Sequence, residues 1–201
     1  MNLILISPAG GGKDTLFSCL PQNYRRYAFG DNIRLVARNL RINGVQPAYS
    51  QLRQMFDLNP PPNLLRKLEE FRRIPQDTKD RKLLQELGTY CRCYDDYIWI
   101  RPIAQVAEYQ SNMCITDCRR TTEFNSFPKF TSVYINTPYE LRLERLKERD
   151  GTVDELALKH KAEQEIESLR SRCTYTIDNS GTLEDLKREL SSCLGLDLKN
   201  I

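Results

Sequence analysis

The fold of this chain is decided near its start, where residues 3–15 read Leu3-Ile4-Leu5-Ile6-Ser7-Pro8-Ala9-Gly10-Gly11-Gly12-Lys13-Asp14-Thr15. The apolar run predicts a buried strand, the glycines predict a turn, and the apolar residues after Thr15 predict a helix. This order is the layout of a phosphate-binding loop, because glycines let backbone N–H groups approach phosphate oxygens and a helix start adds partial positive charge. The alternative is a glycine-rich turn that binds nothing, and the flanking strand and helix argue against it.

Two positions depart from the usual loop pattern G-x-x-x-x-G-K-[ST]. Ser7 stands where the first glycine is expected, and Asp14 stands where a hydroxyl residue is expected. Thr15, one place later, supplies the hydroxyl. We expect Lys13 to bring a mobile positive charge to the β- and γ-phosphates of a nucleotide.

Size and composition restrict the class of protein. The chain has 201 residues, the size of one domain or of one domain with a lid. Its net charge of +3 is mild, so bulk electrostatics give no reason to expect nucleic acid as a partner. The 20 Arg against 10 Lys fit a phosphate-handling site, because the guanidinium group makes bidentate contacts, and they also fit a solvated surface. No apolar run has membrane-spanning length and no signal peptide is recognised, so a cytoplasmic protein is expected.

Cysteine and histidine usage gives no sign of a metal cluster. The seven cysteines are an odd number without C-x-x-C pairs, and we expect free, mostly buried thiols in a reducing compartment. His160 is the only histidine, so neither a histidine metal site nor a Ser-His-Asp triad is expected.

Strand and helix signals alternate along the chain, which predicts a parallel sheet covered on both faces. Strands are expected at residues 2–6, 25–29, 113–116, 131–135 and 174–177. Helices are expected after the cap Asp31, over residues 64–71, from Arg81, after the fourth strand, and from Leu183 behind the capping box Thr182-x-x-Asp185. Residues 44–79 interrupt the rhythm and read as a largely helical insertion over the carboxyl edge of the sheet.

Asp117 ends a short apolar strand and is followed by Arg119 and Arg120. Next to a phosphate-binding loop, a carboxylate at a strand end orients Mg²⁺ or its waters beside the phosphates. The arginines offer contacts to a second phosphate. A strand-ending Asp that only caps the next turn is the structural alternative, and the loop favours the functional interpretation.

Three weaker groups of residues are candidates because of their positions. Arg34 follows Asp31 by one helical turn, where it can face an acceptor phosphate. Gln85 lies in the expected helix from Arg81, where a buried amide would present a donor and an acceptor to a base edge; a plain amphipathic helix is the alternative. Arg145 and Arg149 share a stripe that fits either a cationic lid or a solvated face.

Together these residues resemble nucleoside monophosphate kinases of the adenylate kinase type. The resemblance rests on Gly10-x-Gly12-Lys13-x-Thr15, Gly30-Asp31-x-x-Arg34, Ile115-Thr116-Asp117-x-Arg119-Arg120 and Arg145-x-x-x-Arg149 with Gly151. More narrowly, the chain is similar to virus- and phage-encoded deoxynucleoside monophosphate kinases. That similarity rests on Gly12-Lys13-Asp14-Thr15, on Leu83-Leu84-Gln85 with Gly88-Thr89 and Trp99, and on Asn179-x-Gly181-Thr182-Leu183.

The resemblance implies an α/β fold, a P-loop three-layer sandwich with a five-stranded parallel sheet, an acceptor-binding insertion (about 31–112) and a lid (about 145–170) in a single domain, 1–201. It implies transfer of the γ-phosphoryl group of ATP, with Mg²⁺, to a (deoxy)nucleoside 5′-monophosphate. Residues implied to bind ATP are Gly10, Gly11, Gly12, Lys13, Asp14, Thr15, Asn179 and Gly181, the last two bordering the adenine through their backbone. Thr15 and Asp117 would hold Mg²⁺, directly or through water.

The resemblance also assigns the remaining site residues. Those implied to act on the transferring group are Lys13, Arg119, Arg145 and Arg149. Those implied to bind the acceptor are Asp31, Arg34, Gln85, Arg92 and Arg120. ATP and a (d)NMP are the expected partners, without nucleic acid or membrane; a homodimer stays open, and a viral source would place the protein in the host cytoplasm.

Two other classes stay open. One is a kinase on the same fold for another small phosphorylated acceptor, either dephospho-coenzyme A or phosphomevalonate. The other is a catalytically silent nucleotide-binding regulator, against which the presence of Lys13, Asp117 and several arginines argues.

Overall fold

A computed structural model describes residues 1–77, 80–151 and 161–198. The chain forms two compact units, which are described separately. The first unit joins Met1–Ala28 to Gln110–Ile201, and the second is Phe29–Tyr109. His160 and the middle of the expected lid lie outside the described residues.

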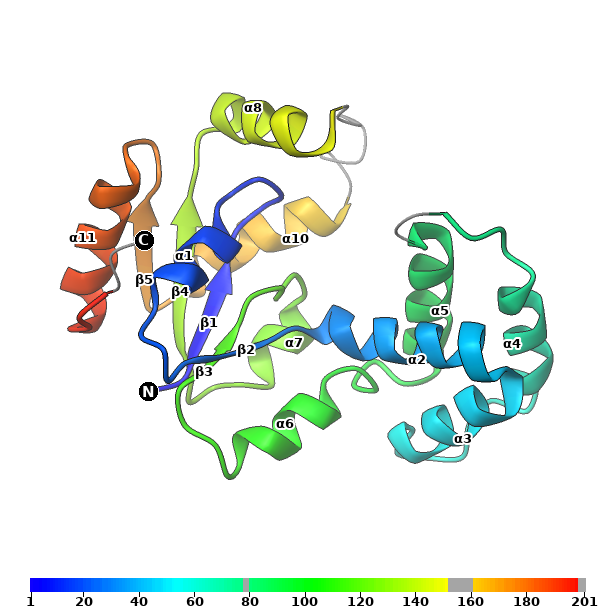
Figure 1. Ribbon diagram of the computed structural model, residues 1–201. Helices are drawn as coiled ribbons and strands as arrows, with labels where there is room; N and C mark the ends of the chain where they lie inside the picture. The colour runs from blue at the N-terminus through cyan, green and yellow to red at the C-terminus, as the bar shows by residue number, and fades with distance from the viewer. Residues whose placement is uncertain (78–79, 152–160, 199–201) are drawn as a thin grey trace. The chain divides into compact units, whose positions relative to one another are not determined.

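The first unit is built on a five-stranded, entirely parallel sheet with strand order β2-β3-β1-β4-β5 (Figure 1). The strands are β1 (Leu3–Ile6), β2 (Arg25–Tyr27), β3 (Met113–Ile115), β4 (Thr131–Asn136) and β5 (Tyr175–Asp178). In this order β1 lies between β3 and β4. The connection that follows β1 runs along the sheet in the opposite direction to the connection that follows β3, so the strand order reverses next to β1. Ligands of open α/β sheets bind at such a point, outside the carboxyl ends of the strands. The α/β fold expected from the sequence is therefore confirmed.

Helices of the first unit cover both faces of this sheet (Figure 1). They are α1 (Lys13–Cys19), α7 (Thr121–Asn125), α8 (Tyr139–Asp150), α10 (Lys161–Leu169) with the 3₁₀ turn η1 (Arg170–Arg172), and α11 (Leu183–Leu194). Helices α1 and α11 lie on one face and α7 and α10 on the other. For α1, α7 and α10, which lie between parallel strands in the chain, this placement is the one that right-handed crossovers require.

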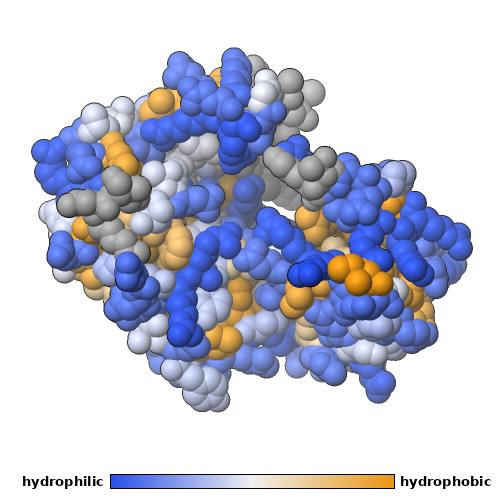
Figure 2. Space-filling view, viewed as in Figure 1, coloured by the Kyte–Doolittle hydropathy of each residue, from blue (hydrophilic) through white to orange (hydrophobic). Residues whose placement is uncertain are grey.

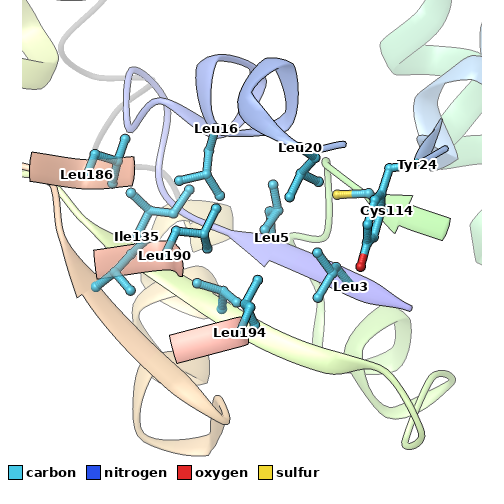
Figure 3. Packing of buried hydrophobic residues seen from close by; sticks show 12 residues of the cluster. Leu3, Leu5, Leu16, Leu20, Tyr24, Cys114, Ile135, Leu186, Leu190 and Leu194 are labelled. Atoms are coloured by element: carbon cyan, nitrogen blue, oxygen red, sulfur yellow. The ribbon is translucent and has the colours of Figure 1, made fainter. Parts of the chain in front are cut away.

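The core of the first unit lies between β1 and the helices α1 and α11 (Figure 3). Leu3 and Leu5 point to this face because side chains alternate along a strand. They meet leucines spaced four residues apart on the two helices and at the C-cap of α1: Leu16, Leu20, Leu186, Leu190 and Leu194. Burial of this apolar surface fixes β1, and with it the start of the loop that follows.

The second unit is helical: α2 (Phe29–Asn43), α3 (Val45–Met55), α4 (Leu64–Arg72), α5 (Arg81–Tyr94) and α6 (Arg101–Ala107). In the described part of residues 44–79, α3 and α4 agree with the expected largely helical insertion; its placement over the sheet edge stays a prediction. Trp99 is buried and ties two helices together. Its Nε1 donates to the carbonyl of Gly88 at 3.3 Å, and its carbonyl accepts from Asn32 Nδ2 at 3.1 Å.

The structure corrects one expectation about element ends. Residues 25–29 were expected as a strand and Asp31 as a helix cap, but β2 ends at Tyr27 and α2 begins at Phe29. The strand stops there because its partner β3 has only three residues and Tyr27 pairs with the last of them, Ile115. Asp31 thus lies inside the first helical turn.

Candidate phosphate-binding site

The loop between β1 and α1 adopts a backbone that requires glycine at two positions. Gly10 and Gly12 have φ angles of 77° and 88°, a region that residues with a Cβ rarely adopt. A Cβ on Gly10 would lie 2.7 Å from the carbonyl oxygen of Arg142, and one on Gly12 would lie 2.7 Å from Asn179 Nδ2. Helix α1 begins directly afterwards at Lys13, so its first backbone N–H groups face the loop without helical acceptors.

The buried side chain of Ser7 explains why position 11, between Gly10 and Gly12, is also a glycine. Its side chain is fully buried, and its hydroxyl donates to the carbonyl of Pro8 at 3.2 Å. A Cβ on Gly11 would lie 1.5 Å from Ser7 Oγ, so Ser7 occupies the space that a side chain at position 11 would need. The departure from the usual loop pattern at position 7 is therefore accommodated by a glycine four residues later.

Lys13 supplies the positive charge of the loop. Its Nζ donates to the carbonyl oxygen of Ser7 at 2.5 Å and to that of Pro8 at 3.2 Å. The ammonium group thus lies against the backbone of the loop itself. Asp14, next along α1, has an 82% exposed side chain 3.9 Å from Arg26 Nε.

Two buried side chains hold the middle of the loop from the carboxyl ends of neighbouring strands. Thr137 follows β4 and donates its hydroxyl to the carbonyl of Gly11 at 3.1 Å. Asn179 follows β5 and donates Nδ2 to the same carbonyl at 3.1 Å, and Nδ2 lies 3.2 Å from Thr137 Oγ1. Sequence reasoning missed Thr137 and expected only a backbone contact from Asn179, because neither partner is near Gly11 in the chain.

A small pocket of about 180 Å³ lies beside the loop. It brings together four residues expected from the sequence, and its apolar wall comes from α11. Its lining residues are Gly12, Thr15, Arg145, Asn179, Leu183 and Leu186. The pocket therefore combines the loop, a cation from α8 and an apolar surface.

Two expected residues are not part of this pocket. Gly181 is exposed, and a Cβ there would lie 2.9 Å from Asp185 Oδ2 in the cap of α11. Arg149 is bonded to Asp150, with Nη2 and Oδ2 2.7 Å apart, and this hydrogen bond raises the pKa of the guanidinium. Helix α8 ends at Asp150, and Gly151, with a φ of 77°, is its C-cap.

The turn after β3 carries Asp117, Arg119 and Arg120. The pairing of β1 with β3 ends at Ile4 and Ile115, and Asp117 lies two residues beyond the end of β3. The backbone N–H groups of Arg119 and Arg120 both donate to Glu123 Oε2, at 2.8 and 3.1 Å. Glu123 was not recognised in the sequence, because the residue at the cap position is Arg120 instead of Ser or Thr.

A second carboxylate reaches the same turn from a distant part of the chain. Glu165 of α10 accepts from the backbone N–H of Thr121, the first residue of α7, at 2.8 Å. Carboxylates at a helix start are stabilising because they satisfy N–H groups that have no helical acceptor. The turn that carries Arg119 and Arg120 is therefore held by α10 as well as by α7.

The donor set of the first unit fits Mg²⁺ better than it fits a metal held by protein alone. Thr15 offers a hydroxyl in the first turn of α1, and Asp117 offers a carboxylate in the turn that follows β3, the strand paired with β1. Mg²⁺ is commonly bound by one or two such oxygens together with substrate phosphates and waters. Across the part of the chain that the structure describes, no group of three or more His, Cys, Asp or Glu residues is arranged to hold a metal ion.

In the second unit, Asp31 and Arg34 form an exposed ion pair on α2, with Oδ1 and Nη1 2.5 Å apart. Helix α5 carries Arg81, Gln85, Gly88 and Arg92 at helical spacing, so these residues share a face. A Cβ on Gly88 would lie 3.1 Å from Ile33 Cδ1 and 3.3 Å from Arg92 Nη2, so α5 packs closely against α2 at Gly88.

Gln85 is exposed, so the expectation of a buried amide at this position is wrong. It lines a groove of about 480 Å³ between α4 and α5. The other lining residues combine cations, aromatic rings and polar groups: Lys67, Phe71, Lys82, Glu86, Thr89 and Tyr90. Asp31, Arg34 and Arg92 are not among them, so the structure does not bring all the expected acceptor residues into one groove.

The surface of α8 is hydrophilic in the view of Figure 2, which agrees with its many charged residues.

None of the helices in the described segments is both long and apolar enough to cross a membrane. All seven cysteines are free: four are buried, two are half-buried and Cys93 is exposed.

Comparison with known sequences gives one short similarity. No protein-family model matches the chain. A stretch of 59 residues is 42% identical to dephospho-CoA kinase of Sulfurimonas denitrificans, covering 29% of this chain and 30% of that enzyme. The match thus spans less than a third of that relative's length.

Comparison with solved structures covers nearly the whole chain. A sugar kinase from Janibacter sp. HTCC2649 matches with a TM-score of 0.53 and 13% identity, over 97% of this chain and 94% of that one. A gluconokinase from Sinorhizobium meliloti 1021 matches with a TM-score of 0.51 and 16% identity, over 96% and 91%. TT1252 from Thermus thermophilus matches with a TM-score of 0.51 and 17% identity, over 97% and 96%. The chain therefore has the α/β fold found in P-loop kinases.

Proposed function

We propose that this protein is a kinase that transfers the γ-phosphoryl group of ATP to a (deoxy)nucleoside 5′-monophosphate. The observation that carries the proposal is the loop at residues 7–13, with its left-handed glycines, its lysine and the start of α1. These are the elements that bind the phosphates of a nucleotide in this fold. The similarity of 59 residues to a kinase supports the same class of reaction.

On the donor side, we propose that the backbone of residues 10–13, with Asp14 and Thr15 beyond it, binds the phosphates of ATP. The pocket lined by Gly12, Arg145 and Leu183 would take the adjoining part of the nucleotide, near Asn179 and Gly181. Mg²⁺ held by Thr15 and Asp117 would neutralise charge on the β- and γ-phosphates when it is bound.

The reaction needs little proton transfer by the protein. An oxygen of the acceptor phosphate attacks the γ-phosphorus, the bond to the β–γ bridging oxygen breaks, and ADP leaves with that electron pair. Catalysis then rests on alignment and on charge stabilisation of the transferring group. We propose Lys13, Arg119, Arg145 and Arg149 for the second task.

On the acceptor side, we propose that the second unit recognises the nucleoside monophosphate. Support comes from the shared face of α5, from the pair Asp31–Arg34, and from the resemblance of these motifs to monophosphate kinases. Gln85 lies in a groove with two aromatic rings and two lysines, a combination suited to a base and an anionic group. Arg34, Arg92 and Arg120 would contact the acceptor phosphate and sugar.

A second candidate acceptor is dephospho-coenzyme A. The observation that favours it is the 42% identity of 59 residues to a dephospho-CoA kinase. Phosphomevalonate and a silent nucleotide-binding role are further readings that the same experiment separates. Cytoplasmic location, in the host if the source is viral, and a homodimer complete the proposal; light scattering on the purified protein measures its assembly.

The acceptor is identified by a thermal-shift screen with a non-hydrolysable ATP analogue present. We expect one or more (d)NMPs to raise the Tm, because a ligand that binds only the folded state stabilises it by mass action. The Gln85→Ala variant should lose this shift unequally across the four dNMPs, whereas Lys129→Ala, an exposed residue of the first unit, should keep it. A shift with dephospho-coenzyme A alone would replace the first proposal by the second, and no shift with any acceptor would favour the silent role.

A further inference from the structure

The carbonyl of Gly11 is the meeting point of two buried donors from different strands. Thr137 Oγ1 and Asn179 Nδ2 each lie 3.1 Å from this oxygen. Their residues are 8% and 4% exposed, so both hydrogen bonds are shielded from water. We infer that Thr137 and Asn179 are positioning residues that aim a backbone N–H of the loop at a bound phosphate. This inference rests on the proposed function, since it concerns the same nucleotide site.

The direction of that N–H follows from the geometry of the peptide bond. The carbonyl of Gly11 and the N–H of Gly12 belong to one planar trans peptide, in which the two groups point in opposite directions. Holding the carbonyl toward Thr137 and Asn179 therefore turns the N–H of Gly12 to the other side of the peptide. A rotation of this peptide would carry the N–H with it, and the phosphate would lose a donor.

The flanking residues would leave this peptide free to rotate if the two side chains were absent. Gly10, Gly11 and Gly12 have no Cβ, and glycine samples a wide range of backbone angles. Gly11 is anchored locally by its own N–H, which donates to the carbonyl of Pro8 at 3.1 Å. Its carbonyl side is held by Thr137 and Asn179, and the next residue, Gly12, has a φ of 88°.

The two donors are themselves fixed by the sheet. Thr137 directly follows β4, and the backbone N–H of Asn179 donates to the carbonyl of Asn136 at 2.8 Å, at the end of the β4–β5 pairing. Their positions are therefore set by the strands and not by the loop. A preorganised donor of this kind stabilises bound anionic charge without reorganisation when the charge arrives.

A matched set of variants removes the hydrogen-bond donor of each side chain while keeping its shape, so that the two contributions can be told apart. Thr137→Val keeps the β-branched shape and removes the hydroxyl, whereas Thr137→Ser keeps the hydroxyl. Asn179→Asp keeps the shape and replaces the amide donor by an oxygen that repels the Gly11 carbonyl. Thr131→Val, at the opposite end of β4, makes the same change away from the loop and serves as the control.

Two readouts are measured on the full chain: the Kd of Mg·ATP by calorimetry, and the Gly12 amide signal in protein labelled with ¹⁵N-glycine. The chain has nine glycines, so this spectrum is small enough to assign. We expect Thr137→Val and Asn179→Asp to weaken Mg·ATP binding by about tenfold or more, the effect of one misdirected donor. Their Gly12 signal should move in the free protein. Thr137→Ser and Thr131→Val should retain both properties.

The outcomes distinguish this inference from the proposed function. If the wild type binds Mg·ATP and the two disruptive variants bind it equally well with an unmoved Gly12 signal, the inference is wrong and the proposed function stands. A lower Tm as the only effect has the same meaning, because it marks a purely structural link between strands. If the wild type does not bind Mg·ATP, the proposed function fails and the inference fails with it. Should Asn179→Asp not fold, Thr137→Val and Thr137→Ser carry the test.

Discussion

Ser7 and Gly11 are a pair of residues in which the size of one dictates the absence of a side chain on the other. Ser7 fills the space under the loop, and a Cβ on Gly11 would overlap its hydroxyl. The sequence pattern alone marks Ser7 as a departure, since glycine is usual at this position. The structure explains it as a local exchange within the loop.

The exchange predicts a coupled pair of substitutions. Gly11→Ala should lower the free energy of unfolding by about 1–3 kcal/mol, the usual cost of forcing an extra group into packed space. Ser7→Gly alone should be tolerated. The double variant should recover part of the loss, because the clash with Ser7 is removed while the contact with the Pro8 carbonyl at 3.0 Å stays. Urea unfolding of all four proteins gives the coupling free energy, and strictly additive effects would contradict the account.

A second prediction concerns Lys13, the lysine of the loop. Lys13→Ala should lower kcat by about 100-fold or more, because the loop loses the cation nearest the transferring group. The fold should survive, since the hydrogen bonds of the lysine to the carbonyls of Ser7 and Pro8 lie within the loop itself. Circular dichroism and ADP release measure the two properties, with Lys129→Ala as the control. A folded Lys13→Ala protein with normal turnover would remove Lys13 from the mechanism.

At the scale of elements, helix α11 shows which ends a sequence specifies. The pattern Thr182-x-x-Asp185 predicted its start, and the structure has both halves of the capping box. Such a helix start can be predicted because both partners of its hydrogen bonds lie within four consecutive residues. The start of α2 was predicted wrongly because it depends on where β3 stops pairing with Tyr27, which lies far away in the chain.

The capping box gives a pH-dependent prediction. Hydrogen bonds from Thr182 lower the pKa of Asp185 below its ordinary value of 3.8. A lowered pKa in the folded state means that the carboxylate stabilises the fold above that ordinary pKa and that this contribution is lost as the pH falls through the folded pKa. Asp185→Asn should therefore reduce the urea midpoint at pH 7, and the difference from wild type should shrink on acidification below 3.8. A difference that grows in acid would contradict this origin of the helix cap.

The candidate site was predictable in its local parts only. The residues of the loop, and Asp117 in the turn after β3, follow from motifs. Thr137 and Asn179 could not be assigned their contacts, because they lie 126 and 168 residues from Gly11 in the chain and meet it only through the strand order. Glu165 was missed for the same reason, since it reaches Thr121 across 44 residues.

At the scale of the whole molecule, the distribution of the cysteines predicts the reactivity of native protein. Cys93 is exposed, whereas burial raises the pKa of the Cys91 thiol to about 12. The thiolate is the reactive form, so buried thiols of raised pKa react slowly. Titration with a disulfide reagent at pH 8 should modify the exposed thiol, Cys93, rapidly. The four buried thiols should react only when the protein unfolds. Rapid reaction of more than the three exposed and half-buried thiols would contradict the packing.

The central claim is that this chain moves a phosphoryl group from ATP to a (deoxy)nucleoside 5′-monophosphate. The most direct measurement incubates the wild-type protein with Mg²⁺, γ-labelled ATP and, in separate reactions, each dNMP or dephospho-coenzyme A, and separates the products by chromatography. We predict label in at least one deoxynucleoside diphosphate, in an amount equal to the ADP formed, and a rate of labelling lower by about 100-fold or more with Lys13→Ala. Label that appears only in inorganic phosphate, or only in the product of dephospho-coenzyme A, would contradict the account.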